Sequence, residues 1–316
     1  MKKGNAMRIR TIAAVLGISA LLLTGCGREG SPGGGGNGDD AGAAPDQCQS
    51  SGVELTVAKD VQVADSPTFD RISEAGKVVI GVKADQPNLG YKDSEGNRCG
   101  FDIEIAQLVA AGLGIDPSKI EYKEIPSEGR ETAIQGGEID YYVGTYSITD
   151  KRKQQIGFAG PYFITGQDLL VRKDDNSIQG PEDLKDKKVC SATGSTSIQR
   201  IKDEGYTSEE NIVEFQTYSE CVTQLLDNKV DAVTTDGAIL AGYAGQAPDQ
   251  LRVVGKIFSE ERYGVGIPKG DVAFCEKVSE ILRTAMKDGT WQKIYDGTLG
   301  RSGAEAEPPA ELDPCS

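Results

Sequence analysis

Two stretches of the chain repeat one pattern of residues, and this repeat constrains the fold more than any other feature. In each, an apolar helical segment turns at Gly or Asn and continues into a strand that ends in hydroxyl groups. The two stretches are TAIQGGEIDYYVGT (132–145) and TQLLDNKVDAVTTD (223–236). Strands that alternate with helices indicate βαβ units and a mainly parallel sheet. Because the pattern occurs twice, the sequence predicts an α/β fold with two similar lobes.

Other segments add elements around these two repeats. We expect strands or strand-like crossings at 78–82, 139–143, 169–172 and 262–268, and a hairpin-like turn in YKDSEGNRCG. Helices are expected near Thr68, over 101–113, from Pro181, from the GSTS turn and over 272–299. Trp291 in the last helix is expected to pack in the core, because a lone aromatic on an apolar helix face is usually buried.

Composition excludes several classes of function. The chain has 316 residues, with 49 acidic and 34 basic side chains, a formal charge of -15 and no histidine. Nucleic-acid binding needs clustered Lys and Arg, which the sequence lacks. Without histidine there is no Ser-His-Asp or Cys-His chemistry and no His-zinc site. We therefore expect no cofactor, no metal and no nucleic-acid partner.

The first 26 residues have the features of a targeting segment. Four basic residues precede an apolar run over 11–23, which ends in Leu-Thr-Gly-Cys26. The run is too short for a mature membrane span, which needs about 20 apolar residues. The tetrad resembles the lipobox of bacterial lipoproteins, in which the cysteine is acylated; an ordinary secretory signal is the alternative. A flexible, Gly-rich tether is expected over 27–67.

Seven cysteines are an odd number for an exported protein. Removing Cys26 for acylation leaves six, and an even remainder suggests disulfides. Many connectivities are possible, and free thiols are the alternative for the two outer pairs. Cys190, at the end of a strand, and Cys221, at the start of a helix, form the first expected pair. The other expected pairs are Cys48–Cys99 and Cys275–Cys315.

The stretch from Arg130 to Arg152 places two cations and several hydroxyls around the end of one strand. In open α/β sheets, ligands lie outside the carboxyl ends of the strands. Thr145 and Ser147 fall at that end. Arg152 lies one helical turn after Thr149, close enough to point into the same crevice. The stretch therefore predicts a site for a small anion.

From about Thr68 to Gly300, the chain resembles the type 3 extracellular solute-binding proteins of amino-acid ABC importers. The resemblance lies in the order and spacing of several motifs. These are KVVIGVKADQPNLGYKDSEGNRCGFDIEIA, ETAIQGGEID, GTYSITDKR, FAGPYFITGQDLLVRK, GSTS and DAVTTD. In combination they resemble the glutamate-binding lipoproteins of actinobacteria in particular.

The resemblance implies a two-lobed periplasmic-binding-protein-like fold of type II, with two α/β domains joined by a two-strand hinge. Lobe 1 would comprise 68–164 and 264–300, and lobe 2 would comprise 165–263. Residues 301–316 would form a polar, Pro-containing tail. The two lobes would close on the ligand like jaws.

The resemblance also assigns roles to the residues that bind the common part of an amino acid. Arg152 would hold the α-carboxylate, and Thr145 and Ser147 would meet the ligand through backbone and hydroxyl groups. Arg152 could instead lie on a solvated helix face. For an amino acid, a planar bidentate cation is the suitable carboxylate donor.

The second lobe would complete the site. Ser195 and Thr196 offer hydroxyls and helix N-terminal amides, which favour an anion. Asp236 matches the acidic residue that binds the ammonium group. The alternatives are that Asp236 is a helix N-cap and that the two hydroxyls only cap their helix.

Two further cations would select the ligand side chain. Family members that take acidic amino acids carry cations at the positions of Arg130 and Lys83. Three cations against Asp236 leave a surplus that suits a dicarboxylate, whereas glutamine would leave charge uncompensated. A surface position is the alternative for Lys83. The aromatic residue that stacks on ligand in other members is replaced by Gln86-Pro-Asn-Leu. Tyr146 and Gln86 are possible substitutes, although packing is the more usual role.

The predicted function is capture of L-glutamate, or L-aspartate, and delivery to the permease subunits of an ABC importer. We expect a monomer at the extracellular face of the cytoplasmic membrane, held by lipid on Cys26. Binding of glutamine or another polar amino acid is one alternative. An enzyme on the same fold, such as a cyclic-acid dehydratase, is another, but it needs an acid or base, and Glu124, Glu128 and Glu131 are interpreted as solvated charges. A sensor lobe for a membrane kinase is the third.

Overall fold

The computed structural model describes residues 48–302 and 305–315. The predicted targeting segment with Cys26, and residues 27–47 of the predicted tether, lie outside the described residues. None of the helices in the described part has the length and apolar character to cross a membrane.

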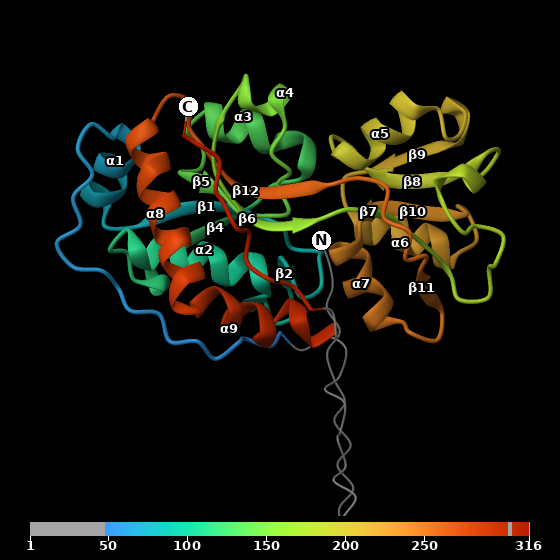
Figure 1. Ribbon diagram of the computed structural model, residues 1–316, viewed down its shortest axis with the longest axis horizontal. Helices are drawn as coiled ribbons and strands as arrows, with labels where there is room; N and C mark the ends of the chain where they lie inside the picture. The colour runs from blue at the N-terminus through green and yellow to red at the C-terminus, as the bar shows by residue number, and fades with distance from the viewer. Residues whose placement is uncertain (1–47, 303–304, 316) are drawn as a thin grey trace, which may run out of the picture. The chain divides into compact units, whose positions relative to one another are not determined.

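Lobe 1 is built on a five-stranded sheet of order β4-β1-β5-β12-β6 (Figure 1). β1 is parallel to β4 and β5, whereas β12 is antiparallel to β5 and β6. The strands are β1 (Val78–Val82), β4 (Ile120–Glu124), β5 (Tyr141–Tyr142), β6 (Gly157–Thr165) and β12 (Glu261–Ile267), with a separate hairpin of β2 (Tyr91–Lys92) and β3 (Arg98–Cys99). The helices are α1 (Pro67–Ala75), α2 (Phe101–Gly112), α3 (Arg130–Gln135), α4 (Asp150–Lys153), α8 (Val272–Asp288) and α9 (Thr290–Gly297).

Lobe 2 is built on a second five-stranded sheet, of order β11-β7-β10-β8-β9. β10 is parallel to β8 and antiparallel to β7. The strands are β7 (Gln167–Arg172), β8 (Val189–Ala192), β9 (Ile212–Phe215), β10 (Ala232–Asp236) and β11 (Leu251–Val253). The helices are α5 (Thr196–Glu204), α6 (Tyr218–Leu226) and α7 (Gly237–Gln246). Short 3-10 turns lie at Pro117–Lys119, Ser127–Gly129, Pro181–Leu184, Glu209–Asn211 and Leu299–Ser302.

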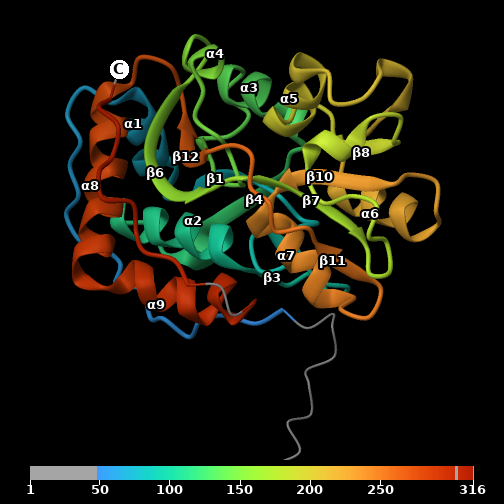
Figure 2. The same cartoon turned by 45° about the vertical axis from the view of Figure 1, so that its right-hand side comes forward.

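The chain crosses between the two sheets twice, as the predicted two-lobed α/β architecture requires. It leaves lobe 1 between β6 and β7, at Gly166, and returns through residues 254–260 into β12 (Figure 2). A Cβ atom at Gly166 would lie 2.3 Å from the backbone oxygen of Ser259. The two crossings therefore pack backbone to backbone, which only glycine permits at this position.

The lobes also meet at Asp85, in the loop that follows β1. Its carboxylate Oδ2 accepts hydrogen bonds from the Tyr218 N–H at 2.9 Å and from the Tyr243 hydroxyl at 3.1 Å, on α6 and α7. Nearby, a Cβ atom at Gly242 of α7 would lie only 2.5 Å from the backbone oxygen of Pro87. These contacts hold the start of α6 and the middle of α7 against lobe 1.

Local sequence explains where several helices begin and end. Ser66 caps α1 by accepting from the Phe69 N–H, and the helix ends at Gly76 with a φ of 60°. Thr217 and Glu220 form a reciprocal capping box at the start of α6. Side-chain caps satisfy N–H groups that a helix start leaves without partners.

A group of aromatic residues forms part of the core of lobe 1. Trp291 is fully buried, and its ring stacks on that of Tyr295 with the centroids 5.4 Å apart. Its Nε1–H donates to the backbone oxygen of Tyr162 at 2.7 Å. Phe101 packs edge-on against Trp291 at 5.5 Å. Trp291 is therefore a core residue, as predicted, with its one polar atom satisfied.

Three predicted elements differ from the structure. The strand expected over 139–143 is only Tyr141–Tyr142, because the Asp140 carboxylate takes the Val79 N–H that a longer ladder would use. The segment that starts at Pro181 is a 3-10 turn. The helix expected over 272–299 is divided at Gly289, whose φ of 81° ends α8 before α9 begins.

The tether predicted over 27–67 is too long at its C-terminal end. Residues 48–66 have no helix or strand, but Val61 packs on the core and the Ala58 N–H donates to the Ala111 oxygen. Disulfide bonds fasten this segment and the C-terminal one. The structure contains Cys48–Cys99, Cys190–Cys221 and Cys275–Cys315, the three pairs that the sequence favours.

Candidate functional site

A cleft of about 690 Å³ lies between the two lobes. Helices α3 and α4 of lobe 1 border it on one side, and the turn before α5 of lobe 2 borders it on the other. Its lining includes Ser127, Glu131, Arg152, Gly194, Ser195 and Thr196. The cleft therefore joins the two segments that the sequence singles out.

Arg130 and Lys83 are both buried in lobe 1 beside this cleft, with 2% and 5% of their surfaces exposed. They share Ser127 as a partner. The Arg130 Nε donates to the Ser127 backbone oxygen at 2.9 Å, and the Lys83 ammonium donates to the Ser127 hydroxyl at 2.8 Å. The surface position considered for Lys83 is therefore wrong, because β1 ends inside the lobe and directs this residue inward.

Arg152 is also buried and has a partner for each part of its guanidinium group. NH1 donates to the Ser147 oxygen at 2.8 Å, NH2 donates to the Gly194 oxygen at 3.0 Å, and Nε lies 3.2 Å from the Glu131 carboxylate. Thr149 caps α4 by accepting from the Arg152 N–H. Arg152 thus contacts both lobes, and it does not lie on a solvated helix face.

Glu131 corrects an interpretation made from the sequence. It is not a solvated charge, because its side chain is only 17% exposed and pairs with Arg152. The two residues meet because α3 and α4 lie side by side at the edge of the cleft, although 20 positions separate them in sequence. The pair fixes one edge of the guanidinium group and leaves NH2 directed at lobe 2.

Tyr146 separates the two arginines. The Arg130 guanidinium lies 4.1 Å from its ring centroid, and the Arg152 guanidinium lies 5.0 Å from it. Tyr146 also packs against Phe158 at 4.9 Å and is fully buried. A ring between two cations favours both through its quadrupole. Tyr146 therefore supports the arginines from the core side.

The cluster carries more positive charge than its neighbours neutralise. Burial, followed by repulsion from Arg130, lowers the pKa of Lys83 to about 7 and that of Arg152 to about 10. Among the described residues, neither Lys83 nor Arg130 forms an ion pair. Buried cations without carboxylate partners are costly in a folded protein. The arrangement suits an anionic ligand.

Asp236 supplies the opposite charge from lobe 2. It ends β10 and is 3% exposed, and its Oδ2 accepts from the Tyr263 hydroxyl at 2.6 Å. Its Oδ1 has no hydrogen-bond partner among the described residues. Burial, followed by repulsion from Glu261, raises the pKa of Asp236 to about 7. Asp236 occupies the N-cap position of α7, as the alternative expected, but its side chain makes no capping hydrogen bond.

The predicted hydroxyl residues of lobe 1 lie beside these charges but are engaged within the protein. Thr145 has a φ of 45°, and its N–H donates to the buried Asp102 carboxylate at 2.9 Å. Its hydroxyl lies 3.1 Å from the amide nitrogen of Gln86. Ser147 contributes its backbone oxygen to Arg152. Gln86 is buried and positions Thr145, so it packs as expected.

The hydroxyl residues of lobe 2 form the start of α5. Ser195 caps the helix by accepting from the Ile198 N–H at 3.1 Å. The Thr196 hydroxyl donates to the Glu261 carboxylate at 3.1 Å. Both residues line the cleft, and capping is the observed role of Ser195.

Sequence reasoning missed Ser127, Tyr263 and Glu261. Ser127 could have been noticed, since it lies three residues before Arg130 in the same turn. Nothing local marks Tyr263, which reaches Asp236 only because β12 returns to lobe 1.

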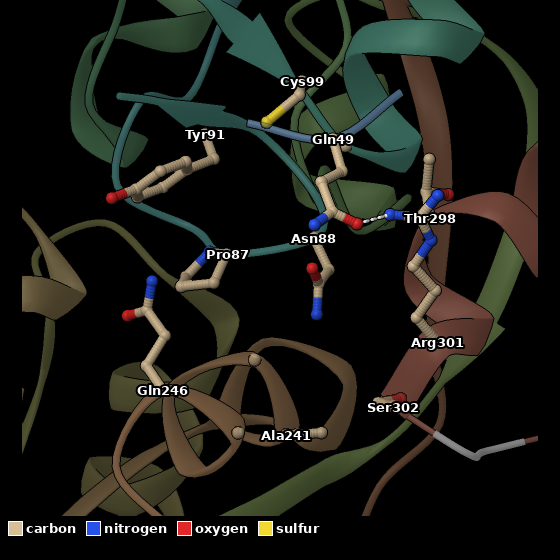
Figure 3. A pocket seen from close by; sticks show the side chains of 13 residues that line it. Gln49, Pro87, Asn88, Tyr91, Cys99, Ala241, Gln246, Thr298, Arg301 and Ser302 are labelled. Carbon is tan, nitrogen blue, oxygen red and sulfur yellow. Dashed lines mark hydrogen bonds between the residues drawn. The ribbon is translucent and has the colours of Figure 1, made fainter. Parts of the chain in front are cut away.

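A second cavity, of about 320 Å³, lies where the segment after β1 meets α7 (Figure 3). Its lining includes Gln49, Asn88, Tyr91, Gln246 and Arg301, and Gln49 accepts a hydrogen bond from Arg301. Of the described residues that line this cavity, Arg301 is the only charged one. The first cleft is lined by the opposed charges of Glu131 and Arg152, and Ser127 of its lining binds Lys83 and Arg130, so it is the candidate ligand site.

Comparisons with known proteins agree with this architecture. Residues 78–301 match the family model of the bacterial extracellular solute-binding proteins, family 3. The glutamate-binding protein GluB of Corynebacterium efficiens is 40% identical over 259 residues, which cover 79% of this chain and 87% of that protein. The ABC transporter glutamine-binding protein GlnH of Bacillus subtilis is 33% identical over 300 residues, covering 94% and 99%.

A solved structure is similar as well. An ancestral arginine-binding protein bound to arginine superposes with a TM-score of 0.65 at 38% identity, covering 70% of this chain and 97% of that one. The two relatives are named for binding glutamate and glutamine, and the solved structure is of a protein that binds arginine. This chain therefore belongs to the bacterial extracellular solute-binding proteins of family 3.

Proposed function

We propose that this protein captures L-glutamate, or L-aspartate, between its two lobes and delivers it to an ABC permease. The observation that carries the proposal is the set of three buried cations, Lys83, Arg130 and Arg152, opposed by the buried carboxylate of Asp236. The 40% identity to a glutamate-binding relative supports the same ligand. The protein would act as a receptor and would not be an enzyme.

The common part of the amino acid would bind to residues from both lobes. Arg152 would hold the α-carboxylate through its NH2 edge, which faces the turn before α5. Asp236 would accept the ammonium group through Oδ1, which has no other partner among the described residues. Backbone and hydroxyl groups of Thr145, Ser147, Ser195 and Thr196 would complete the contacts. Contacts to both lobes favour closure.

The side-chain carboxylate would bind to Arg130 and Lys83. These two residues have neutral hydrogen-bond partners only, since Ser127 accepts from both and the Gly194 backbone oxygen accepts from Arg130. A carboxylate would neutralise them, whereas the amide of glutamine would leave a buried net positive charge at a cost of several kcal/mol. This difference supports glutamate over the glutamine that one relative is named for.

The proposal places the receptor outside the cell. Residues 1–26 would direct export, and lipid on Cys26 would anchor the protein to the extracellular face of the cytoplasmic membrane. The protein would act as a monomer beside its permease.

Calorimetry with a panel of amino acids tests the ligand. We expect one glutamate per protein lacking residues 1–26, weaker aspartate and much weaker glutamine. Arg152→Gln should abolish binding of every amino acid, because it removes the partner of the group they share. Arg130→Gln should reduce glutamate binding about a hundredfold and glutamine binding little, since a hydrogen-bonded charge contributes about 2–3 kcal/mol.

Lys123→Gln is the control, because Lys123 belongs to the same lobe but pairs with Glu138 at the surface. Its glutamate affinity should equal that of the wild type. Tighter binding of glutamine or of a basic amino acid by the wild type would overturn the proposed ligand. Equal losses of glutamate and glutamine in Arg130→Gln would show that Arg130 does not select the side chain.

A further inference from the structure

The C-terminal segment 305–315 has no helix or strand, but it is fixed to lobe 1. Figure 1 shows it as the dark red trace that runs beside α8 to the C-terminus. Cys315 forms a disulfide with Cys275 of α8, and Pro309 is buried. The segment therefore lies across lobe 1 as a strap, anchored near its end.

Asp313 of the strap connects three elements of lobe 1. Its N–H donates to the Gly160 oxygen of β6 at 2.6 Å. Its carboxylate accepts from both terminal nitrogens of Arg262, at 2.6 and 3.3 Å, and from the Lys153 ammonium at 3.1 Å. The Asp313 side chain is 17% exposed. Hydrogen bonds from the surrounding cations hold its pKa below the usual value, although burial opposes this.

The two cations bound by Asp313 are sequence neighbours of residues in the proposed site. Lys153 follows Arg152 in α4, a helix of one turn. Arg262 precedes Tyr263 in β12, and Tyr263 donates to Asp236. The backbone oxygen of Arg262 also accepts from the Ile148 N–H at 2.8 Å, next to Ser147.

The strength of the contact depends on its geometry. A single exposed ion pair contributes little, because water and salt screen it. Here the Asp313 carboxylate accepts hydrogen bonds from two nitrogens of Arg262 and from Lys153. Such charge-assisted hydrogen bonds are stronger than neutral ones, and they also fix the orientation of the partners. Because α4 spans only Asp150–Lys153, a contact at Lys153 acts on the same helical turn that carries Arg152.

We propose that Asp313 is a positioning residue for ligand binding. Through Lys153 it orients the helix that carries Arg152, and through Arg262 it orients the strand that carries Tyr263. The Cys275–Cys315 disulfide keeps Asp313 in place. This role rests on the proposed function, since it is expressed as affinity for the amino acid.

The test is Asp313→Asn in the mature protein with its disulfides intact. We expect glutamate affinity to fall about fivefold, as a loss of about 1 kcal/mol implies. The melting temperature without glutamate should stay within about 2 °C of the wild type, and the ratio of glutamate to glutamine affinity should not change. Asp313→Glu, which keeps the charge, should recover most of the affinity.

A double-mutant cycle locates the effect. Asp313→Asn combined with Arg262→Gln should weaken binding no more than Asp313→Asn alone, because Asp313→Asn already removes the contact with Arg262. Glu138→Gln, which removes a surface partner of Lys123 in the same lobe, is the control and should bind normally. Wild-type affinity in Asp313→Asn, or a lower melting temperature with unchanged affinity, would overturn the positioning role. Failure of the wild type to bind glutamate would instead overturn the proposed function.

Discussion

Lys83 and Asp236 have opposite charges, and burial shifts the pKa of each to about 7. The pKa of Lys83 falls from 10.5, and that of Asp236 rises from 3.8. In both cases the charged form is disfavoured in the folded protein. In the ligand-free protein each group is therefore only partly charged near neutral pH, where the ligand would need both charges.

These shifts predict a pH optimum for binding. Below pH 7 Asp236 becomes protonated and cannot pair with an ammonium group, and above pH 7 Lys83 loses its proton. We expect glutamate affinity to be highest near pH 7. Calorimetry in buffers of different ionisation enthalpy should show proton uptake on binding above this pH and proton release below it. Proton exchange of one sign from pH 5.5 to 8.5 would contradict the assignment.

Stability should respond with the matching sign. Burial of Asp236 lowers the free energy of unfolding as the pH rises from 3.8 to about 7. In this range the folded protein keeps a proton that the unfolded chain has lost. Burial of Lys83 lowers the free energy of unfolding as the pH falls from 10.5 to about 7. In this range the unfolded chain binds a proton that the folded protein lacks. Glutamate should therefore raise the melting temperature most near pH 7.

The sequence predicts which charged residues lie in the site better than it predicts which residues they contact. Arg130 and Arg152 could be predicted as site residues because they flank a repeated helix–turn–strand motif. Tyr263 and Glu131 could not, because their contacts depend on a returning strand and on helix packing. The ligand roles of all these residues remain predictions.

The Cys190–Cys221 disulfide joins β8 to α6 in lobe 2. It closes a loop with a sequence separation of 31 residues, so removing it gives the unfolded chain more freedom. Replacing both cysteines by serine should lower the free energy of unfolding by about 3 kcal/mol. Urea unfolding without ligand would measure this change. An unchanged midpoint would contradict a stabilising role.

Most elements could be predicted from local signals. The strand at Val78–Val82 and the helix from Phe101 match the expected ranges because both are apolar runs, and Gly100 precedes the helix. β5 is shorter than expected because the Asp140 side chain competes with the backbone for the Val79 N–H. The ordering of residues 48–66 depends on a disulfide to a distant hairpin, which local sequence does not reveal.

Gly242 of α7 closely approaches the Pro87 backbone of lobe 1, and the proposed closure of the lobes would require this approach. Gly242→Ala should weaken glutamate, aspartate and glutamine binding equally, by about tenfold, because the new Cβ would hold the lobes apart. Calorimetry with all three ligands would measure this effect. Gly245→Ala is the matched control, since a Cβ there has nothing within 4 Å and both changes favour the helix.

Unequal losses among the three ligands would show that Gly242 acts on the ligand side chain and not on closure. Small-angle scattering would separate the two outcomes, because the Gly242→Ala protein with glutamate should remain more open than the wild type with glutamate. The Gly245→Ala protein should contract like the wild type.

The contact between Asp85 and the start of α6 joins the lobes without using any residue proposed to bind the amino acid. This contact would supply part of the free energy of closing before a ligand arrives, and some empty receptors would then adopt the closed form. A permease that recognised only that form would also meet empty receptors as competitors. The uptake rate would then depend on how far glutamate raises the fraction of closed receptors above the fraction that is closed without ligand. A weaker Asp85 contact would enlarge this difference but would lower the affinity for glutamate.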